Sequence, residues 1–479
     1  MYENYGLYIG GQWRPAASGA TYPVLDPGTE ETLGEAPAAG PEDAEAAIAA
    51  AAEGMKAWRA MNAWERGAIL RKAADLMVER KDAIARTIAL EVGRPLAACG
   101  GEVQLAIDQF YWYAEETKRL YGQIVESRLP GGRIGVTYEP VGIVAAFSAW
   151  NFPVVLPARK IAPALGAGCS VIVRPSEEAP GGSMALIACL HDAGVPAGAV
   201  NLLTGKASVI SPVLMASQAV RKVSLTGSTA VGIRLLKEAA DTVKRVSMEL
   251  GGHAPVIVFD DVDARKVATM AAQSKYRNTG QVCVSPSRFY VHETVKDSFV
   301  DSFVETTKAL KLGHALEPDS DVGPLTTRKR LEEVEALVED TRASGARLLT
   351  GGQRPAGFNR GYWFEPTVFD DVADDARIMV EEPFGPIAPI TSFKHFDEVM
   401  ERANSLEMGL ASYVFTRSLQ RAHESVEAIE AGMVAVNTFA MATAEAPFGG
   451  IKQSGYGREG GSQGILDYMN VKYMNMVVE

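Results

Sequence analysis

The hydrophobic and polar positions of this chain follow two patterns, and the change between them falls near residue 140. Residues 41–119 predict helices. The first helix opens with Pro41 followed by acidic residues, which are favourable at the positive end of a helix dipole. The N-terminal part of the chain therefore predicts a helical block.

Beyond this block, short apolar strands alternate with helices. The expected strands of the first series are "GIVAAF", "CSVIVRP", "AVNLLTG" and "KVSLTG". A second series begins with "APVIVFDD" at residue 254 and runs to about 436. It includes a charged helix over 327–340, which is expected to be solvated surface. The alternation predicts an α/β fold with parallel sheets covered by helices on both faces.

Two further segments predict an extended β structure. Residues 120–139 are typical of a hairpin with its turn at "PGG", and the C-terminal segment 468–479 is apolar and alternating. A lone terminal strand at an exposed edge would invite uncontrolled pairing. We expect it to pair either with the hairpin or with another subunit.

Length, charge and cysteine content narrow the class of protein. At 479 residues the chain predicts two or three domains. Its net charge of −12 argues against a nucleic-acid partner and repels anionic substrates unless local cations bind them. The four cysteines have no paired or metal-like spacing, which favours a reducing compartment and no metal site. With no signal peptide and no apolar run long enough to cross a bilayer, we expect a cytoplasmic protein without a membrane partner.

A nucleotide site is indicated after the strand "KVSLTG". The segment "GSTAVG", 227–232, opens a helix, whose free N–H groups and dipole suit a phosphate. Glu177 follows a neighbouring strand, where an acidic residue binds a cofactor ribose hydroxyl and disfavours a 2′-phosphate. Arg174 could accommodate that phosphate. NAD is therefore favoured, and NADP is possible.

Cys283, in "YRNTGQVCVSPSR", is a candidate nucleophile because of the other motifs that occur in the same chain. A lone cysteine is more often a small buried apolar residue. Here it occurs with Asn151 in "AWNFP", Glu249 in "MELGGH", Glu382 in "EEPFGP" and the segment "PFGGIKQSGYGRE". These motifs, in this order from "YIGGQW" to the C-terminal end, resemble the aldehyde dehydrogenase superfamily.

The resemblance implies a domain organisation. A Rossmann-like NAD-binding domain would comprise 1–119 and 140–250, and a second α/β catalytic domain would comprise 251–436. A small β arm for oligomerisation, formed by 120–139 and 437–479, would make the protein a homodimer or homotetramer.

The resemblance also implies a catalytic set. Cys283 would attack the aldehyde, since a thiolate is a strong nucleophile. The side-chain amide of Asn151 and the backbone N–H of Cys283 would hold the oxyanion. Glu249 would activate the water that hydrolyses the thioester. Relatives that transfer the acyl group to coenzyme A typically lack this glutamate, so release of a free acid is expected.

The cofactor cleft would be formed by residues at matching positions. Glu382 would bind the nicotinamide ribose and Phe384 would lie beside the ring. The full set implied by the resemblance is Trp150, Lys160, Arg174, Ser176, Glu177, Gly227, Ser228, Leu250, Glu382 and Phe384.

Three positions indicate the class of aldehyde. Arg159, Arg277 and Thr443 match the carboxylate-binding trio of the succinate-semialdehyde dehydrogenases, which have serine at the third position. Two guanidiniums and a hydroxyl would hold a carboxylate at the far end of a short semialdehyde. Many members of that subfamily have a second cysteine two residues after the nucleophile, where this chain has Ser285. Glutarate or 2-oxoglutarate semialdehyde would use the same anchor.

Other functions remain open at this stage. If the arginines are structural, the substrates would be apolar or aromatic aldehydes. A non-catalytic binding protein could dispense with the nucleophile and the base. A thiol hydrolase would share Cys283 but would not require a nucleotide site.

Overall fold

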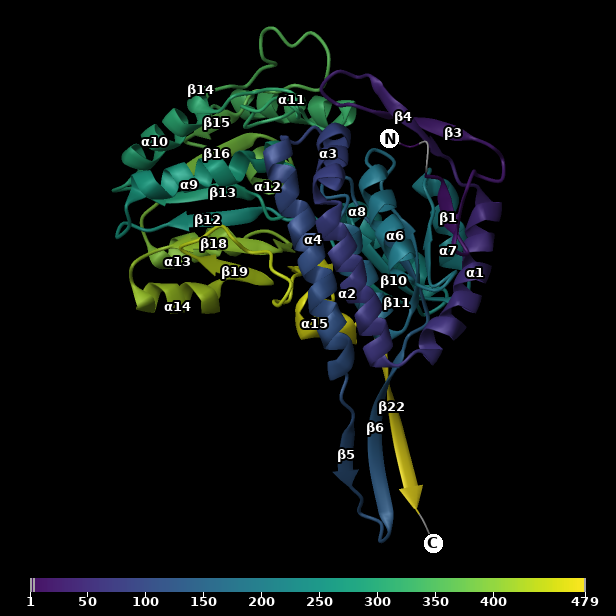
Figure 1. The fold of residues 1–479 in the computed structure, drawn as a ribbon. Coiled ribbons are helices and arrows are strands. Elements are labelled where there is room, and N and C mark those ends of the chain that lie inside the picture. The colour runs from purple at the N-terminus through teal and green to yellow at the C-terminus, as the bar shows by residue number, and fades with distance from the viewer. Residues whose placement is uncertain (1, 3–4, 478–479) are drawn as a thin grey trace.

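The first sheet carries the expected strand and helix alternation. The computed structural model describes residue 2 and residues 5–477. Within them, an eight-stranded sheet has the order β2-β1-β9-β8-β7-β10-β11-β21, and β7 to β11 run parallel (Figure 1). Its strands are β1 (Leu7–Ile9), β2 (Gln12–Arg14), β7 (Ile143–Phe147), β8 (Ser170–Arg174), β9 (Val200–Leu202), β10 (Val220–Thr226), β11 (Arg245–Glu249) and β21 (Gly455–Tyr456). The helices around it are α1 (Pro41–Ala60), α5 (Val155–Ala167), α6 (Gly181–Ala193), α7 (Ala207–Ala216) and α8 (Thr229–Ala240).

A second sheet lies beside the first (Figure 1). It has the order β14-β15-β16-β13-β12-β18-β19 and is parallel except for the β14–β15 pair. Its strands are β12 (Ala254–Val258), β13 (Pro286–His292), β14 (Arg347–Thr350), β15 (Thr367–Asp370), β16 (Ile387–Phe393), β18 (Ala411–Phe415) and β19 (Met433–Val436). Its helices are α9 (Ala264–Tyr276), α10 (Lys296–Ala309), α11 (Arg328–Ala343), α12 (Arg377–Val380), α13 (Phe396–Asn404) and α14 (Leu419–Ala428).

The predicted helical block is present. After α1 it comprises α2 (Ala63–Glu79), α3 (Lys81–Val92), α4 (Leu96–Glu116) and the short helix η1 (Thr117–Arg119). Asn62 begins α2: its side chain accepts hydrogen bonds from the Trp64 and Glu65 N–H groups, and Glu65 accepts one from the Asn62 N–H. Reciprocal caps of this kind satisfy N–H groups that a helix start leaves free. The packing of α4 against α5 links the block to the first sheet.

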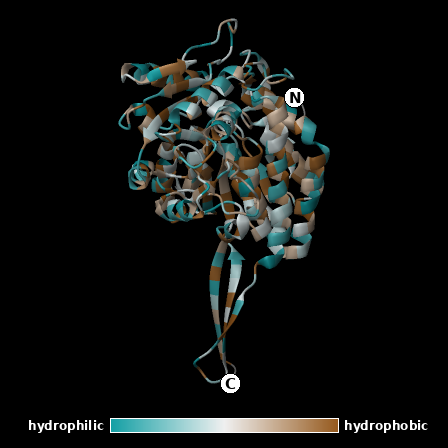
Figure 2. Cartoon of the chain, turned by 90° about the vertical axis from the view of Figure 1, so that its left-hand side faces the viewer, coloured by the Kyte–Doolittle hydropathy of each residue, from teal (hydrophilic) through white to brown (hydrophobic). Residues whose placement is uncertain are grey.

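The predicted hairpin and terminal strand form one antiparallel arm below the two sheets (Figures 1 and 2). It consists of β5 (Gln123–Glu126), β6 (Gly132–Pro140) and β22 (Met469–Val477), in the order β22-β6-β5. Of the two alternatives for the C-terminal strand, pairing with the hairpin is the one found, with Val471 opposite Tyr138. Ile124 is 81% exposed and Val471 is 66% exposed, so the arm presents apolar side chains to solvent.

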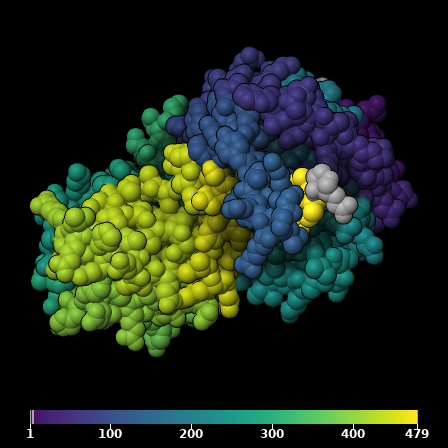
Figure 3. Space-filling view, turned by 90° about the horizontal axis from the view of Figure 1, so that it is seen from below, coloured from purple at the N-terminus to yellow at the C-terminus, as the bar shows by residue number. Residues whose placement is uncertain are grey.

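Of the chain after β19, residues 469–477 pair with β6 in the three-stranded sheet. The preceding residues form β20 (Ile451–Lys452), β21 and α15 (Gly461–Leu466), and β21 is the edge strand of the first sheet. Seen from below, the C-terminal residues drawn in yellow lie against the helical block drawn in blue (Figure 3). Two small antiparallel pairs are also present: β3 (Thr21–Leu25) with β4 (Thr32–Pro37), and β17 (Met408–Gly409) with β20. The domain limits predicted from the sequence stay a prediction.

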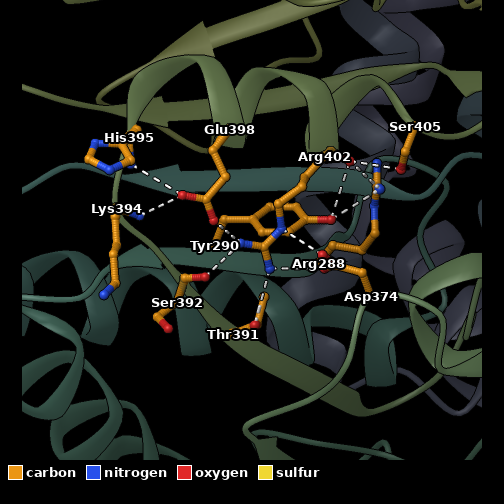
Figure 4. A network of polar contacts seen from close by, with 10 residues as sticks. All are labelled: Arg288, Tyr290, Asp374, Thr391, Ser392, Lys394, His395, Glu398, Arg402 and Ser405. Atoms are coloured by element: carbon orange, nitrogen blue, oxygen red, sulfur yellow. Dashed lines mark hydrogen bonds and ion pairs between the residues drawn. The ribbon is translucent and has the colours of Figure 1, made fainter.

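A polar network fixes α13 to the second sheet (Figure 4). Arg288 donates to the backbone carbonyls of His253 at 3.0 Å and Ala403 at 2.9 Å, so it joins the segment before β12 to the C-terminal end of α13. Arg402 donates to the Ser392 carbonyl at 2.7 Å and lies over the Tyr290 ring. Because buried guanidiniums need several acceptors, such a network holds one arrangement of these elements.

Candidate active site

The loop before Cys283 has an unusual backbone. The short helix η2 (Arg277–Gly280) contains three successive residues with positive φ: Asn278 at 50°, Thr279 at 55° and Gly280 at 73°. This region is tolerated by asparagine and glycine but is strained for a β-branched residue such as Thr279. Thr279 is held there by a 2.9 Å hydrogen bond from its hydroxyl to the Gly323 carbonyl. Strain that persists in this way is typical of functional sites.

Gly280 packs closely against the backbone of Gly385. A Cβ atom at this position would lie 2.1 Å from the Gly385 carbonyl oxygen, so only glycine fits. Next to it, the Gln281 side chain accepts a 3.0 Å hydrogen bond from the Thr326 N–H. The turn that presents Cys283 is therefore fixed from both sides.

Asn151 follows β7 and reaches this turn. Its side-chain amide donates to the Gln281 carbonyl at 3.1 Å, which leaves the second amide hydrogen for a ligand. The Asn278 side chain donates to both the Asn151 carbonyl and the Gln281 carbonyl, at 3.2 Å each. Asn151 is 3% exposed, so its orientation is determined by these contacts and not by solvent.

Arg94 positions Asn151 and was not identified from the sequence. Its guanidinium donates to the Asn151 carbonyl and, at 3.1 Å, to the Asn278 side chain. It also forms a buried 2.8 Å ion pair with Glu102, whose other oxygen accepts from the N–H groups of Val154 and Val155. Glu102 therefore caps the start of α5, the helix that carries Arg159 and Lys160. No recognisable motif surrounds Arg94 in the sequence.

The thiol of Cys283 is partly exposed to the cleft but closely surrounded by protein. Burial raises its pKa to about 12, and the carboxyl groups of Glu382 and Glu249 act in the same direction, whereas Arg159 opposes them. Cys283 is therefore a neutral thiol at rest and requires activation to attack.

Glu249, at the end of β11, is the base expected from the sequence. It is 4% exposed, and one carboxylate oxygen, Oε2, has no hydrogen-bond partner among the described residues. A Cβ atom on Gly449 would lie 2.7 Å from the other oxygen, so this glycine gives the carboxylate its space. Burial raises the pKa of Glu249 well above its ordinary value, and nearby Glu459 adds to the shift while Lys160 and Arg159 oppose it.

Lys160 and Glu459 form a buried ion pair below Glu249. Lys160 is fully buried and also donates to the Thr226 hydroxyl at 2.7 Å. Lys160 does not line the open cleft, where the resemblance would put it, but lies beneath the cleft. Glu459 was not singled out from the sequence, although it ends the motif "PFGGIKQSGYGRE".

A cleft of about 580 Å³ opens above Cys283. Six of the ten expected cofactor residues line it: Trp150, Gly227, Ser228, Leu250, Glu382 and Phe384. The rings of Trp150 and Phe384 meet edge to face at 5.6 Å. Burial raises the pKa of Glu382 to about 8, against a hydrogen bond from the Gly252 N–H and the charge of Arg330, which lower it.

The prediction that 327–340 is only a solvated surface was wrong for its beginning. Thr327 and three residues from the first turns of α11, Lys329, Arg330 and Glu333, line the cleft. Alternating charges along a helix indicate which face is in contact with solvent, but they do not indicate what the end of the helix contacts. Here the N-terminal end of α11 forms one wall of the cleft. The rest of α11 packs its apolar side against the second sheet.

The cleft fits a dinucleotide at the start of α8. Ser228 is the N-cap residue of this helix, and Leu250 packs so closely over Gly232 that a Cβ there would lie 2.5 Å from Leu250 Cδ2. The start of α8, with Ser228 at the cleft, offers the positive end of the helix dipole to an anionic group such as a phosphate.

Arg174 ends β8, Ser176 and Glu177 follow it, and none of the three lines the cleft. Arg174 donates to the Gly205 carbonyl at 2.8 Å and pairs with Glu177 at 3.1 Å. The Ser176 hydroxyl donates to Glu178, which does line the cleft. The guanidinium that could have attracted a 2′-phosphate is therefore occupied by the Glu177 carboxylate and a carbonyl.

The three expected substrate-anchor residues differ in their surroundings. Arg159 is 3% exposed, its guanidinium carbon lies 4.1 Å from the centre of the Phe448 ring, and Nε has no partner among the described residues. Arg277 is exposed by area, yet burial lowers its pKa, and it does not line the cleft above Cys283. Thr443 is exposed on the loop that leads to Phe448.

Comparison with known proteins decides the family. Residues 13–474 match the sequence profile of the Aldehyde dehydrogenase family. This chain belongs to the aldehyde dehydrogenase family. It is an oxidoreductase that uses NAD or NADP, and its fold is the α/β fold expected from the motifs.

Several relatives extend over nearly the whole aldehyde dehydrogenase chain. A glutarate-semialdehyde dehydrogenase of Pseudomonas putida is 43% identical over 98% of this chain and 96% of its own length. A succinate-semialdehyde dehydrogenase [NADP(+)] of Escherichia coli is 42% identical over 97% and 96%. The crystal structure of a succinate-semialdehyde dehydrogenase from Burkholderia pseudomallei matches with a TM-score of 0.97 and 43% identity, covering 99% of this chain and 98% of that chain.

Proposed function

We propose that this aldehyde dehydrogenase oxidises a short aldehyde that carries a second, anionic group, such as succinate or glutarate semialdehyde, to the free acid, with NAD preferred over NADP. The observation that carries the proposal is Arg159, a buried guanidinium that forms no ion pair with any carboxylate in the described part of the chain.

A buried charge without a counterion is costly. Leaving one partner of a buried pair alone typically costs about 3–5 kcal/mol. The cation–π contact of Arg159 with the Phe448 ring offsets only about 0.5–2 kcal/mol of this cost. An anionic substrate group would supply the missing charge, and a guanidinium suits a carboxylate because it donates in a planar fork.

Arg277 supports the same anchor. No hydrogen bond or ion pair involves its side chain among the described residues, and its charge is close enough to Cys283 to interact with the thiol. Together with Arg159 it would give a local positive field in a chain whose net charge is −12. Without this field, the protein as a whole would repel an anionic aldehyde.

The names of relatives agree with this chemistry. Two curated relatives are named for semialdehydes with a carboxylate, and a third, from Pseudomonas putida and 43% identical, is a 3-sulfolactaldehyde dehydrogenase. The shared feature of these names is an aldehyde with an acidic group.

The residues assign a sequence of steps. The Cys283 thiol gives up its proton, the first of the two protons released, and its sulfur adds to the aldehyde carbon. The oxyanion would accept hydrogen bonds from the Asn151 amide and the Cys283 N–H. When bound, NAD supplies the hydride acceptor and a positive ring that stabilises the thiolate. Glu249 then takes a proton from the water that hydrolyses the thioester. The balance is RCHO + NAD⁺ + H₂O → RCOO⁻ + NADH + 2H⁺.

The preference for NAD rests on charge. Glu178 lines the cleft, and the neighbouring Glu177 is paired with Arg174, so two carboxylates would repel a 2′-phosphate and the guanidinium is already engaged. Replacing Glu177 by Gln frees Arg174 and should raise the kcat/KM for NADP relative to NAD.

Assays with a panel of aldehydes test the proposed function. Succinate and glutarate semialdehyde are compared with hexanal and benzaldehyde, each with NAD and with NADP, by NADH or NADPH absorbance. We expect the acidic aldehydes with NAD to give the highest kcat/KM. Equal or higher values for hexanal or benzaldehyde would contradict the anchor, and higher values with NADP would contradict the cofactor preference.

We also infer that the arm mediates a homodimer or homotetramer, because its exposed apolar strands need cover. Removal of 469–477 should change the molar mass measured by light scattering. An unchanged mass would contradict this role.

A further inference from the structure

The loop between β8 and α6 is held at its far end by a carboxylate that takes no part in the reaction steps. We call residues 175–180 the cofactor loop, because they carry Glu177 and Glu178, on which the NAD preference rests. The carboxylate of Glu91, in the last turn of α3, accepts hydrogen bonds from the first two N–H groups of α6 at 2.7 Å and 3.3 Å. Since α6 begins where the cofactor loop ends, Glu91 fixes the end of this loop.

Glu91 is a buried carboxylate without a cation. It is 1% exposed, and it forms no ion pair within the described part of the chain. Burial raises its pKa to about 7, although the hydrogen bonds that it accepts act in the opposite direction. A Cβ atom on Gly181 would lie 2.6 Å from one of its oxygens, so glycine lets the carboxylate reach the positive end of the α6 dipole. A buried charge of this kind depends on every hydrogen bond that it accepts.

The third hydrogen bond to this carboxylate comes from the N-terminal segment. The Tyr2 hydroxyl donates to Glu91. The Tyr2 ring is buried against Gly34 of β4, where a Cβ atom would lie 2.5 Å from the ring carbon Cδ2. Tyr2 and Glu91 are 89 positions apart, so no local pattern in the sequence indicates this contact.

A second tyrosine is close to both Glu91 and the cofactor loop. Tyr22, in β3, has a buried hydroxyl without a hydrogen-bond partner among the described residues. Burial raises its pKa, and the charges of Arg174, Glu177 and Glu91 are near enough to shift it as well. The N-terminal segment therefore lies against the rear of the cofactor loop, while the front of the loop lines the cleft.

The same end of α3 also supports the oxyanion residue. Glu91 precedes Arg94 by one helical turn, and the Arg94 guanidinium donates to the Asn151 carbonyl. A general loosening of this end of α3 would therefore lower kcat through Asn151. A displacement confined to the cofactor loop would instead weaken cofactor binding and leave kcat unchanged, so the two effects can be distinguished.

We propose that Glu91 and Tyr2 are positioning residues for the cofactor, which hold the cofactor loop so that its carboxylates meet the adenosine ribose and select NAD. The inference deepens the proposed function and rests on its NAD preference. Neither residue lines the cleft, so both act through the start of α6 and not by touching the cofactor.

Titration of the full-length chain with NADH and with NADPH, followed by nucleotide fluorescence, tests this role. Tyr2→Phe removes one hydroxyl and keeps the ring. Glu91→Gln keeps the volume but removes the charge. The control is Tyr5→Phe, because Tyr5 is a partly buried tyrosine of the same segment whose hydroxyl forms no hydrogen bond among the described residues. Steady-state assays at saturating NAD give kcat for each variant.

In Tyr2→Phe the Kd of NADH should rise about tenfold, the effect of losing one hydrogen bond to a charged group. The Kd of NADPH should rise less, because a displaced loop also repels the 2′-phosphate less. We expect kcat to be unchanged. Since both residues act through one contact, Tyr2→Phe/Glu91→Gln should bind NADH no more weakly than Glu91→Gln alone.

An unchanged Kd of NADH in Tyr2→Phe would overturn the proposal. An equal rise for NADH and NADPH, a fall in kcat, or the same effect in Tyr5→Phe would show a general structural role and overturn it as well. If Glu91→Gln does not fold, Tyr2→Phe decides alone. A wild-type chain that binds NADPH more tightly than NADH would contradict the proposed NAD preference, whereas the change in Kd between variant and wild type still decides whether these residues hold the loop.

Discussion

The side-chain amide of Asn151 donates a 3.1 Å hydrogen bond to the Gln281 carbonyl, two residues before Cys283. This contact orients the remaining amide hydrogen for an oxyanion. Asn151→Ala should lower kcat about 10²- to 10³-fold, the usual effect of losing one oxyanion donor. Steady-state NADH formation measures it, and binding of NADH by fluorescence is expected to persist. A change in KM alone would contradict the role.

Arg94 should matter for stability as well as for activity. Its buried ion pair with Glu102 fixes the start of α5. Arg94→Met would leave Glu102 as a buried carboxylate without a counterion, and we expect a loss of about 3–5 kcal/mol in the free energy of unfolding. Urea titration followed by circular dichroism measures it. The double variant with Glu102→Gln should recover part of the loss, and no recovery would contradict the pairing argument.

The reactivity of Cys283 should depend on pH in an unusual way. Its pKa is raised to about 12, and raising the pH forms the thiolate, so alkylation by iodoacetamide should keep accelerating between pH 8 and pH 10. A free thiol would level off near about 8.5. Cys283→Ala, which should abolish NADH formation, identifies the labelled residue by mass spectrometry. A plateau near pH 8.5 would mean that the thiol is less buried.

Glu249→Gln should separate the two halves of the reaction. The variant keeps the volume but cannot take a proton, so an NADH burst should be followed by turnover that is slower by about 10²- to 10⁴-fold. In the wild type, burial raises the pKa of Glu249, and the base form appears only as the pH rises through that value. Hydrolysis should therefore accelerate with pH. A variant without a burst would place the defect before hydrolysis.

Substitution of the anchor arginines should change specificity more than rate. Arg159→Met keeps much of the stem that packs on Phe448 but removes the charge. The kcat/KM for succinate semialdehyde should fall by about 10²-fold, as expected when a charged pair loses about 3 kcal/mol, whereas hexanal should be oxidised at least as well as before. Arg277→Met is the independent second variant. Equal losses for both aldehydes would show that the arginines are structural.

The sequence predicted the elements that depend on a local pattern of residues. It missed contacts between residues that are far apart in the chain. The strands of both sheets, the helical block and the arm follow from apolar runs and turn residues, and Cys283, Asn151 and Glu249 occur in recognisable motifs. Arg94 contacts Asn151, far away in the chain, and its own neighbours carry no such signal. Glu459 ends a recognisable motif, but its partner Lys160 lies far away in the chain, so the motif alone does not reveal the ion pair. The first turn of α11 was assigned to solvent for the same reason, because charge pattern does not reveal that a helix end meets a cleft.

The segment after β19 brings together parts that are distant in sequence. Phe448 reaches Arg159, Glu459 reaches Lys160, and β22 pairs with β6 more than three hundred residues earlier. Contacts of such long range form late, because the intervening chain must first be ordered. The Lys160–Glu459 ion pair and the β22–β6 pairing therefore depend on the ordering of one and the same segment of the chain.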